Sequence, residues 1–173
     1  KDKGDCASIA TNINWISRTQ YKFNNKGRLV VDRSARTNRA GSRYYSSRLD
    51  KAIAARGTID ITKDTKTASG QDISEAGEAN TNIPGTPGTV RVTVSGKAGP
   101  QTLGTNKEPI SSGPEYVQMH ELVGHAIPRI VGSDTGNAID NENKVRQEVS
   151  PGKLRESDPN HIEYFPFETW EEP

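Results

Sequence analysis

An apolar stretch framed by two prolines, Pro114 and Pro128, constrains the fold of this chain more than any other feature. Pro114 suits the first turn of a helix, where its missing N–H is not needed, and Ser111, Ser112 or Gly113 can cap that helix. Pro128 predicts a kink or an end, because proline removes a hydrogen bond inside a helix. Only 31% of the 173 residues are hydrophobic, so we expect a thin core and long loops elsewhere.

Within that helix lies the sequence His120-Glu121-Leu122-Val123-Gly124-His125. Two histidines supply the imidazole nitrogens that zinc binds, and a catalytic zinc takes three protein ligands while one position stays open for water. The metal lowers the pKa of that water, and a neighbouring carboxylate accepts its proton as it attacks a carbonyl carbon. We therefore expect His120 and His125 to bind a metal and Glu121 to act as general base.

The spacing of the two histidines differs from the usual zinc motif. Histidines at positions i and i+4 share one face of an α-helix. His120 and His125 stand at i and i+5, which places them about 140° apart around an ideal helix. One extra residue absorbed as a π-bulge would bring the two rings back into line, and such bulges are common at functional sites. Gly124 is a suitable position for that distortion.

A third metal ligand should come from a later element. Residues 141–148 have the pattern of a second helix, entered through a polar turn. Glu142 lies 17 residues after His125, which leaves room for a turn and the start of an antiparallel helix. We predict Glu142 as the third ligand, with Asp140 and Glu148 as alternatives.

These residues together resemble the zincin metallopeptidases whose third ligand is a glutamate. The Asn141-Glu142 pair resembles the ligand pair of thermolysin-like enzymes, and the six-residue motif with glycine before the second histidine resembles that of the dipeptidyl peptidase III group. Residues 89–146 also resemble the metallopeptidase toxin domains of bacterial polymorphic and Rhs-type secreted proteins. The resemblance implies one zinc ion bound by His120, His125 and Glu142, and hydrolysis of a protein substrate.

The resemblance also implies a biological setting. Such toxin domains are the C-terminal parts of larger secreted proteins, act inside a target cell and are matched by an immunity protein. The chain begins with Lys1 and shows neither a signal peptide nor an apolar stretch long enough to span a membrane. We therefore expect residues 1–173 to be a single domain that is delivered as part of a larger bacterial protein.

Two residues near the C-terminus are candidates for stabilising the oxyanion of the transition state. His161 or Tyr164 could fold back over the metal, as a later tyrosine or histidine does in thermolysin-like enzymes. A surface histidine and a tyrosine that packs the C-terminal segment are an equal interpretation. Arg146 could stabilise charge as well, but a salt bridge to a nearby acid is the stronger expectation.

The remaining sequence predicts an α+β fold with a small, twisted, mostly antiparallel sheet packed on the active-site helix and the ligand-bearing helix. The residues up to Ile16 show no clear period. The other expected elements are a hairpin at 21–32, a helix at 44–56 ended by Gly57, a strand at 58–62, and long loops at 63–88 and 96–113. The strictly alternating strand 90–94 should be the edge strand over the cleft, where it would pair with extended substrate.

The charge of the chain is unevenly distributed although the net charge is only +1. Up to Arg56 there are 13 Lys and Arg against 4 acids, and the remainder has 10 against 18. A basic half can mark contact with nucleic acid or an anionic membrane. Here the arginines lie among polar residues with two tyrosines as the only aromatics beside them, so we expect a solvated face or one that docks on the acidic half.

Two other functions stay open. The domain could be a binding module, with or without metal, that lacks proteolytic activity, although Glu121 would serve no purpose in a purely structural site. It could instead be a nuclease-type toxin that binds nucleic acid, although the Asp clusters of metal-dependent nucleases are not evident. The single cysteine, Cys6, excludes a disulfide scaffold and a Cys-rich zinc ribbon and has no evident role.

Overall fold

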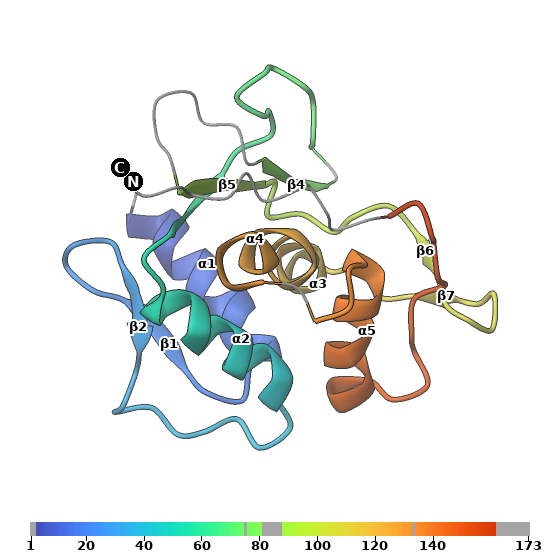
Figure 1. Cartoon of the computed structure of the whole chain (residues 1–173), viewed down its shortest axis with the longest axis horizontal. Helices are drawn as coiled ribbons and strands as arrows, with labels where there is room; N and C mark the ends of the chain where they lie inside the picture. Colours follow the sequence, from blue (N-terminus) through green and yellow to red (C-terminus); the bar gives the residue numbers. More distant parts are fainter. Residues whose placement is uncertain (1–2, 75, 81–87, 133, 162–173) are drawn as a thin grey trace.

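The apolar segment after Pro114 forms the central helix of the fold, and Figure 1 shows α1 and α2 on one side of it, α5 on another and β4 and β5 above. The computed structural model describes residues 3–74, 76–80, 88–132 and 134–161. The central helix has three successive parts, which are α3 (Pro114–Met119), the π-helical segment η1 (His120–Ala126) and α4 (Ile127–Val131). Pro128 does not end the helix, because it lies in the first turn of α4, where a proline is tolerated. The helix ends instead at Gly132, which has a φ of 83°.

The N-terminal residues, for which the sequence showed no period, form α1 (Lys3–Ile16). Ile9, Ile13 and Ile16 lie on one face of this helix and are buried in the core, where α1 contacts α3. Their spacing of four and three residues is that of an amphipathic helix. The amphipathic pattern was therefore present in the sequence, but it consisted of only these three isoleucines.

The predicted helix at 44–56 is confirmed as α2 (Arg43–Ala54), with Ser42 as its N-cap. Its predicted end at Gly57 is wrong, because the C-cap is Ala55 in an extended conformation. Gly57 has a different physical role. A Cβ at that position would lie 2.6 Å from Cδ1 of Ile130, so glycine is needed for the close approach of α4.

The main sheet has three strands in the order β3 (Thr58–Lys63), β5 (Thr89–Val94) and β4 (Gly77–Asn80). β5 is parallel to β3 and antiparallel to β4. The expectation that residues 90–94 form the edge strand is wrong, because β5 is the central strand. Its apolar residues Val90, Val92 and Val94 are buried, and Thr93 on the other face is buried as well.

The edge strand β4 lies within residues 63–88, which the sequence analysis assigned to one long loop. A bridge between Lys66 and Asp72 adds further structure to this segment, while residues 75 and 81–87 lie outside the described part. β4 has the sequence Gly-Glu-Ala-Asn, which contains no β-branched or aromatic residue. Its pairing with β5 is therefore set by tertiary contacts rather than by local propensity.

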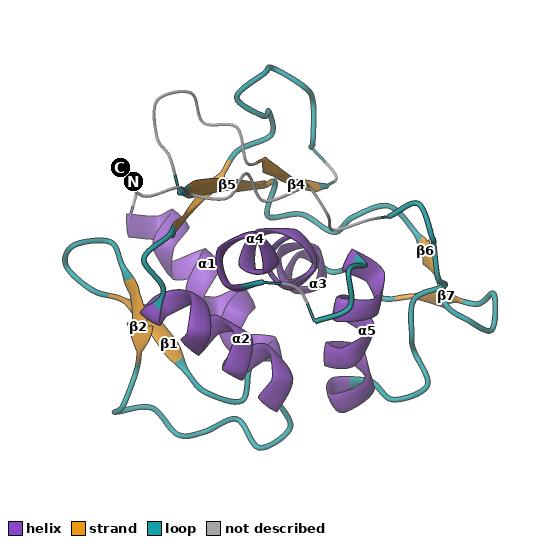
Figure 2. Ribbon diagram, in the orientation of Figure 1, coloured by secondary structure: helices purple, strands orange, loops and turns teal. Residues whose placement is uncertain are grey.

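Two small antiparallel pairs and one more helix complete the described elements (Figure 2). The predicted hairpin is confirmed as β1 (Tyr21–Phe23) and β2 (Leu29–Val31), and β6 (Thr102–Leu103) pairs with β7 (Pro109–Ile110). The second predicted helix is α5 (Ala138–Val149), capped by Asn137. The fold is thus α+β with mostly antiparallel pairing, as the sequence predicted. No helix within the described residues is both long and apolar enough to span a membrane.

Candidate metal centre

The central helix takes the π form over the whole histidine motif, from His120 to Ala126. The backbone N–H of Ile127 donates to the carbonyl of Leu122, five residues earlier, whereas an α-helix uses the carbonyl four residues earlier. A π turn holds about 4.4 residues, so a five-residue step returns close to the same face. The predicted π distortion is confirmed, and it extends over seven residues instead of a single bulge.

Gly124 allows this π-helical segment to approach α5 closely. A Cβ on residue 124 would lie 3.1 Å from Cβ and 3.2 Å from the carbonyl oxygen of Ala138, the first residue of α5. Both distances are shorter than ordinary van der Waals contacts, and protein interiors are too closely packed to absorb the extra volume without a shift. The glycine in the motif therefore sets the separation of the two helices that build the site.

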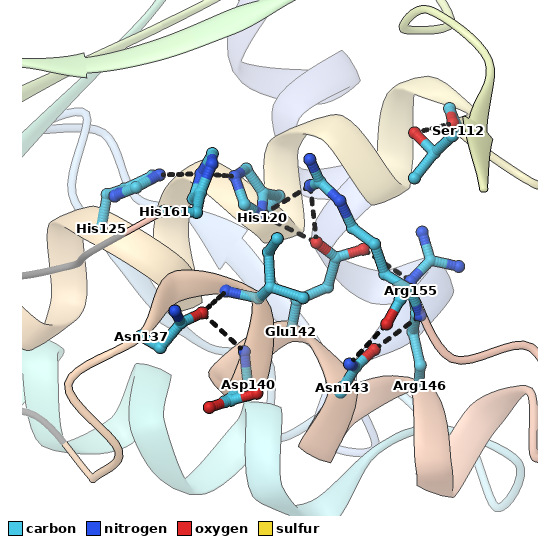
Figure 3. A network of polar contacts seen from close by, with 12 residues as sticks. Ser112, His120, His125, Asn137, Asp140, Glu142, Asn143, Arg146, Arg155 and His161 are labelled. Atoms are coloured by element: carbon cyan, nitrogen blue, oxygen red, sulfur yellow. Dashed lines mark hydrogen bonds and ion pairs between the residues drawn. The ribbon is translucent and has the colours of Figure 1, made fainter. Parts of the chain in front are cut away.

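The rings of His120, His125 and His161 form a nearly equilateral cluster beside η1 (Figure 3), with centroids 5.0, 5.0 and 5.1 Å apart. Nε2 of His161 lies 3.1 Å from Nε2 of His120 and 3.2 Å from Nε2 of His125. In a tetrahedral site with Zn–N bonds of about 2.05 Å, neighbouring ligand nitrogens are about 3.3 Å apart. Within the described part of the chain, these three side chains form a group that could hold one metal ion.

His161 is held in the cluster by the turn before it and by the start of α5. Its backbone N–H donates to the carbonyl of Asp158 at 3.0 Å, and the N–H of Ala138 donates to its own carbonyl at 3.2 Å. The side chain of Asn137 caps α5 and also donates from Nδ2 to the carbonyl of Asp158 at 3.0 Å. From the sequence, His161 was a candidate for stabilising an oxyanion over the metal, or else a surface histidine. The structure places its Nε2 among the potential ligand atoms.

Glu142, the predicted third ligand, lies behind His120 and not among the Nε2 atoms. Its Oε2 is 2.8 Å from Nδ1 of His120, the ring nitrogen that points away from the cluster. A carboxylate at this distance accepts the Nδ1–H, and in the neutral ring this leaves the lone pair on Nε2, directed into the cluster. The carboxylate is 1% exposed. Its position is that of a group that orients a metal-binding histidine, which differs from the predicted ligand role.

Two arginines also hold the carboxylate of Glu142. Nε of Arg146 donates to Oε1 at 2.5 Å, and Nη1 of Arg155 donates to Oε2 at 3.1 Å. The first pair is an i,i+4 contact on α5, which confirms the expected salt bridge of Arg146. Arg155 is fixed by Asn143, whose side chain accepts from its N–H at 2.8 Å and donates to its carbonyl at 2.9 Å. Sequence reasoning missed Arg155, because no local pattern shows that the chain returns to α5 at this point.

Burial lowers the pKa of two of the three clustered histidines, His125 and His161. It lowers the pKa of His125 to about 2, with repulsion from His120 and His161 as the next causes. Burial and His120 also lower the pKa of His161. Burial raises the pKa of Glu142, but its hydrogen bond and charge interaction with His120 and the two arginine charges outweigh this and hold that pKa well below the usual range. The lowered pKa values of His125 and His161 favour the unprotonated imidazoles that metal binding requires.

Glu121, the predicted general base, is buried against the sheet. It directly follows His120 and is 7% exposed. A Cβ on Gly77, the first residue of β4, would lie 2.8 Å from Cγ of Glu121, so the side chain is packed against this edge strand. Tyr164, the other candidate for stabilising an oxyanion, lies outside the described residues.

The two alternative ligands have other positions. Asp140 is exposed in the first turn of α5. The carboxylate of Glu148 accepts a hydrogen bond from the hydroxyl of Ser42 at 2.5 Å and another from the N–H of Tyr44 at 2.9 Å, and so ties the end of α5 to the start of α2. Neither residue belongs to the group of potential ligand atoms in the described part of the chain.

A comparison with family models, with curated proteins and with solved structures found no match to this chain.

Proposed function

We propose that the chain is a zinc-dependent hydrolase that cleaves peptide bonds in a protein substrate. The observation that carries the proposal is the approach of the Nε2 atoms of His120, His125 and His161 to 3.1 and 3.2 Å. Three imidazoles, with Nε2 of His161 this close to the other two, match the ligand set of a catalytic zinc with one open position. The all-nitrogen donor set favours zinc over calcium or magnesium, which prefer oxygen ligands.

The residues around the cluster have separate roles in this proposal. When bound, zinc supplies Lewis acidity that polarises a carbonyl group and lowers the pKa of water. Glu121 accepts the proton released by the attacking water and passes it to the leaving amine. Glu142 holds the Nδ1–H of His120 at 2.8 Å and fixes the direction of its Nε2. Arg146 and Arg155 keep Glu142 ionised, so that this hydrogen bond stays charge-assisted.

The position of β4 supports a peptide as the substrate class. Among the described residues β4 pairs with β5 alone and forms an edge of the sheet. Its first residue, Gly77, lies against Glu121. An edge strand can bind an extended peptide through main-chain hydrogen bonds. We therefore assign the substrate-pairing role to β4 in place of the strand at 90–94.

The first test is the metal content of the purified chain by inductively coupled plasma mass spectrometry after zinc loading and desalting. The parent protein should retain about one zinc per chain, as expected for a single site. His161→Ala should retain close to none, whereas Asp140→Asn, a change of the exposed alternative ligand, should match the parent. Full zinc retention by His161→Ala would overturn the three-histidine assignment.

Hydrolysis is tested separately with the zinc-loaded protein on a proteome-derived peptide library read by mass spectrometry. The parent should cleave peptides, and Glu121→Gln should keep its zinc but lose cleavage. A parent that binds zinc and cleaves no peptide would favour the alternative of a metal-bound binding module, and cleavage of nucleic acid would favour a nuclease. Action as a secreted toxin that is matched by an immunity protein rests on the resemblance alone.

A further inference from the structure

A groove beside Trp15 is separate from the metal centre. It has a volume of about 610 Å³ and lies where α1 meets the loop before α2, the start of α3 and the end of α5. Its lining residues include Trp15, Arg36 and Tyr116. They do not include any of the three histidines or Glu142, which orients His120. Trp15 is 70% exposed, which is the highest exposure of a large hydrophobic residue in the described part of the chain.

The walls of this groove are held rigidly by side-chain amides. Asn38 donates to the carbonyls of Asn14 and Trp15 at 3.4 and 3.3 Å and accepts from the N–H of Ala40 at 3.2 Å. Asn14 in turn bonds to both the N–H and the carbonyl of Tyr21, at 2.7 and 2.8 Å. These amides are therefore engaged within the protein. The groups that the groove presents to a ligand are the indole of Trp15 and the guanidinium of Arg36.

The loop that lines the groove through Arg36, Asn38 and Ala40 belongs to an exposed basic stretch, residues 22–43, which forms a basic surface. Between residues 22 and 43 the exposed cations are Lys22, Lys26, Arg28, Arg33, Arg36, Arg39 and Arg43. The acid within this stretch is Asp32, which pairs with Lys22 at 2.9 Å. No ion pair within the described residues joins the other six to the acidic half of the chain, and these exposed cations fit the solvated face that the sequence predicted as one of two alternatives. The result is a preformed surface that combines an aromatic side chain with several arginines.

We propose that this basic surface and the Trp15 groove bind an acidic protein partner. The partner would insert an apolar or aromatic side chain beside Trp15 and place carboxylates against Arg36 and its neighbours. Trp, Tyr and Arg are the residues that dominate binding energy at protein interfaces, especially where they line a pocket. This inference does not depend on the metal centre, because neither the groove nor the basic surface contains a residue of that site.

Single-stranded nucleic acid is the competing polyanion. Proteins that bind it stack successive bases on several aromatic side chains along a positive groove. Of the two aromatic residues that line the groove, Trp15 is exposed, whereas Tyr116 is half-buried with Arg146 over its ring, so this surface offers one exposed aromatic platform. A single aromatic residue within a pocket fits one anchoring side chain of a protein better than a run of bases.

The test uses a labelled random copolymer of glutamate and tyrosine as the acidic probe, with binding read by fluorescence anisotropy at about 50 mM and about 300 mM salt. The chain should bind the probe, and the higher salt should weaken binding, because exposed charges are screened. Arg36→Glu should weaken binding by about tenfold. The matched control is Lys66→Glu, the same charge change at an exposed lysine outside this surface, and it should change affinity by less than about twofold.

Trp15→Ala provides the second arm. Trp15 is one of two tryptophans in the sequence, and the proposal makes it the one that contacts the probe. The probe-induced change in tryptophan fluorescence should therefore disappear in Trp15→Ala, and the affinity of this variant for the probe should fall. Zinc content and the midpoint of urea unfolding should stay at parent values in all three variants, because the altered side chains are exposed. Equal binding by the parent and Arg36→Glu would overturn the proposal. So would tighter, Trp15-dependent binding of an oligodeoxythymidine, which would assign the surface to nucleic acid.

Discussion

The carboxylate of Glu142 should act on zinc affinity through His120 without touching the metal, and Glu142→Gln tests this. The carboxylate is 1% exposed and accepts hydrogen bonds from His120, Arg146 and Arg155. An amide has one acceptor oxygen, so the variant can no longer serve all three donors. Loss of a group that orients a metal-binding histidine costs about 10- to 100-fold in metal affinity. This corresponds to about 1.4–2.7 kcal/mol, much less than the loss of a ligand.

The same substitution should destabilise the zinc-free protein. Arg146 has a side chain that is 3% exposed, and removal of its counter-charge leaves a buried cation. Breaking a buried ion pair in this way costs about 3–5 kcal/mol. Arg146 keeps its hydrogen bond to the carbonyl of Ser111 at 3.0 Å, so we expect a loss in the free energy of unfolding near the lower limit, about 3 kcal/mol.

A double variant separates the two effects. Zinc affinity is measured by competition with a chelator, and stability by urea unfolding without metal. Glu142→Gln combined with Arg146→Met removes the unpaired buried charge, so it should regain part of the stability but none of the zinc affinity. Zinc affinity within about twofold of the parent in Glu142→Gln would refute the orienting role. Complete loss of zinc, equal to that of His161→Ala, would show that Glu142 is itself a ligand.

Three further outcomes are expected. Gly124→Ala should lower the free energy of unfolding by about 1–3 kcal/mol in urea, because its methyl group would lie 3.1 Å from Cβ of Ala138. Lowering the pH should destabilise the zinc-free protein: His125, with a native pKa of about 2, stays neutral when folded, whereas the unfolded chain gains a proton below pH 6.5. The loss in the free energy of unfolding, about 1.4 kcal/mol per pH unit, should be smaller in His125→Ala. Urea unfolding at several pH values measures it. Chelation of zinc should speed tryptic cleavage after the exposed Lys153, as read by mass spectrometry, because the metal would anchor the following segment through His161.

Much of the fold could be predicted wherever the pattern was local and dense. The hairpin around β1 and β2, the helix α2 and the helix α5 all follow from turn residues, caps and apolar spacing within about one dozen residues. The strand β4 could not be predicted, because its four residues carry no strand propensity. Its place beside β5 also decided that the strongest strand pattern in the sequence belongs to the centre of the sheet and not to its edge.

The sequence by itself determined the first half of the candidate site. The order of residues from His120 to His125 demanded a π turn if both rings were to share one face, and backbone hydrogen bonds within a single helix satisfy that demand. It also predicted a second helix that carries a carboxylate, and Glu142 lies in the second turn of α5.

Only the tertiary structure decided which residue completes the cluster. His161 lies 36 residues after His125 and reaches it through a chain reversal that hydrogen bonds from Asn137 and Ala138 hold in place. A helix limits the relative positions of residues one turn apart through its fixed rise and hydrogen bonds. A returning segment has no such constraint, so its position depends on contacts that form only when the whole chain has folded. For this reason Glu142, near in sequence, orients His120, while the distant His161 brings the third nitrogen.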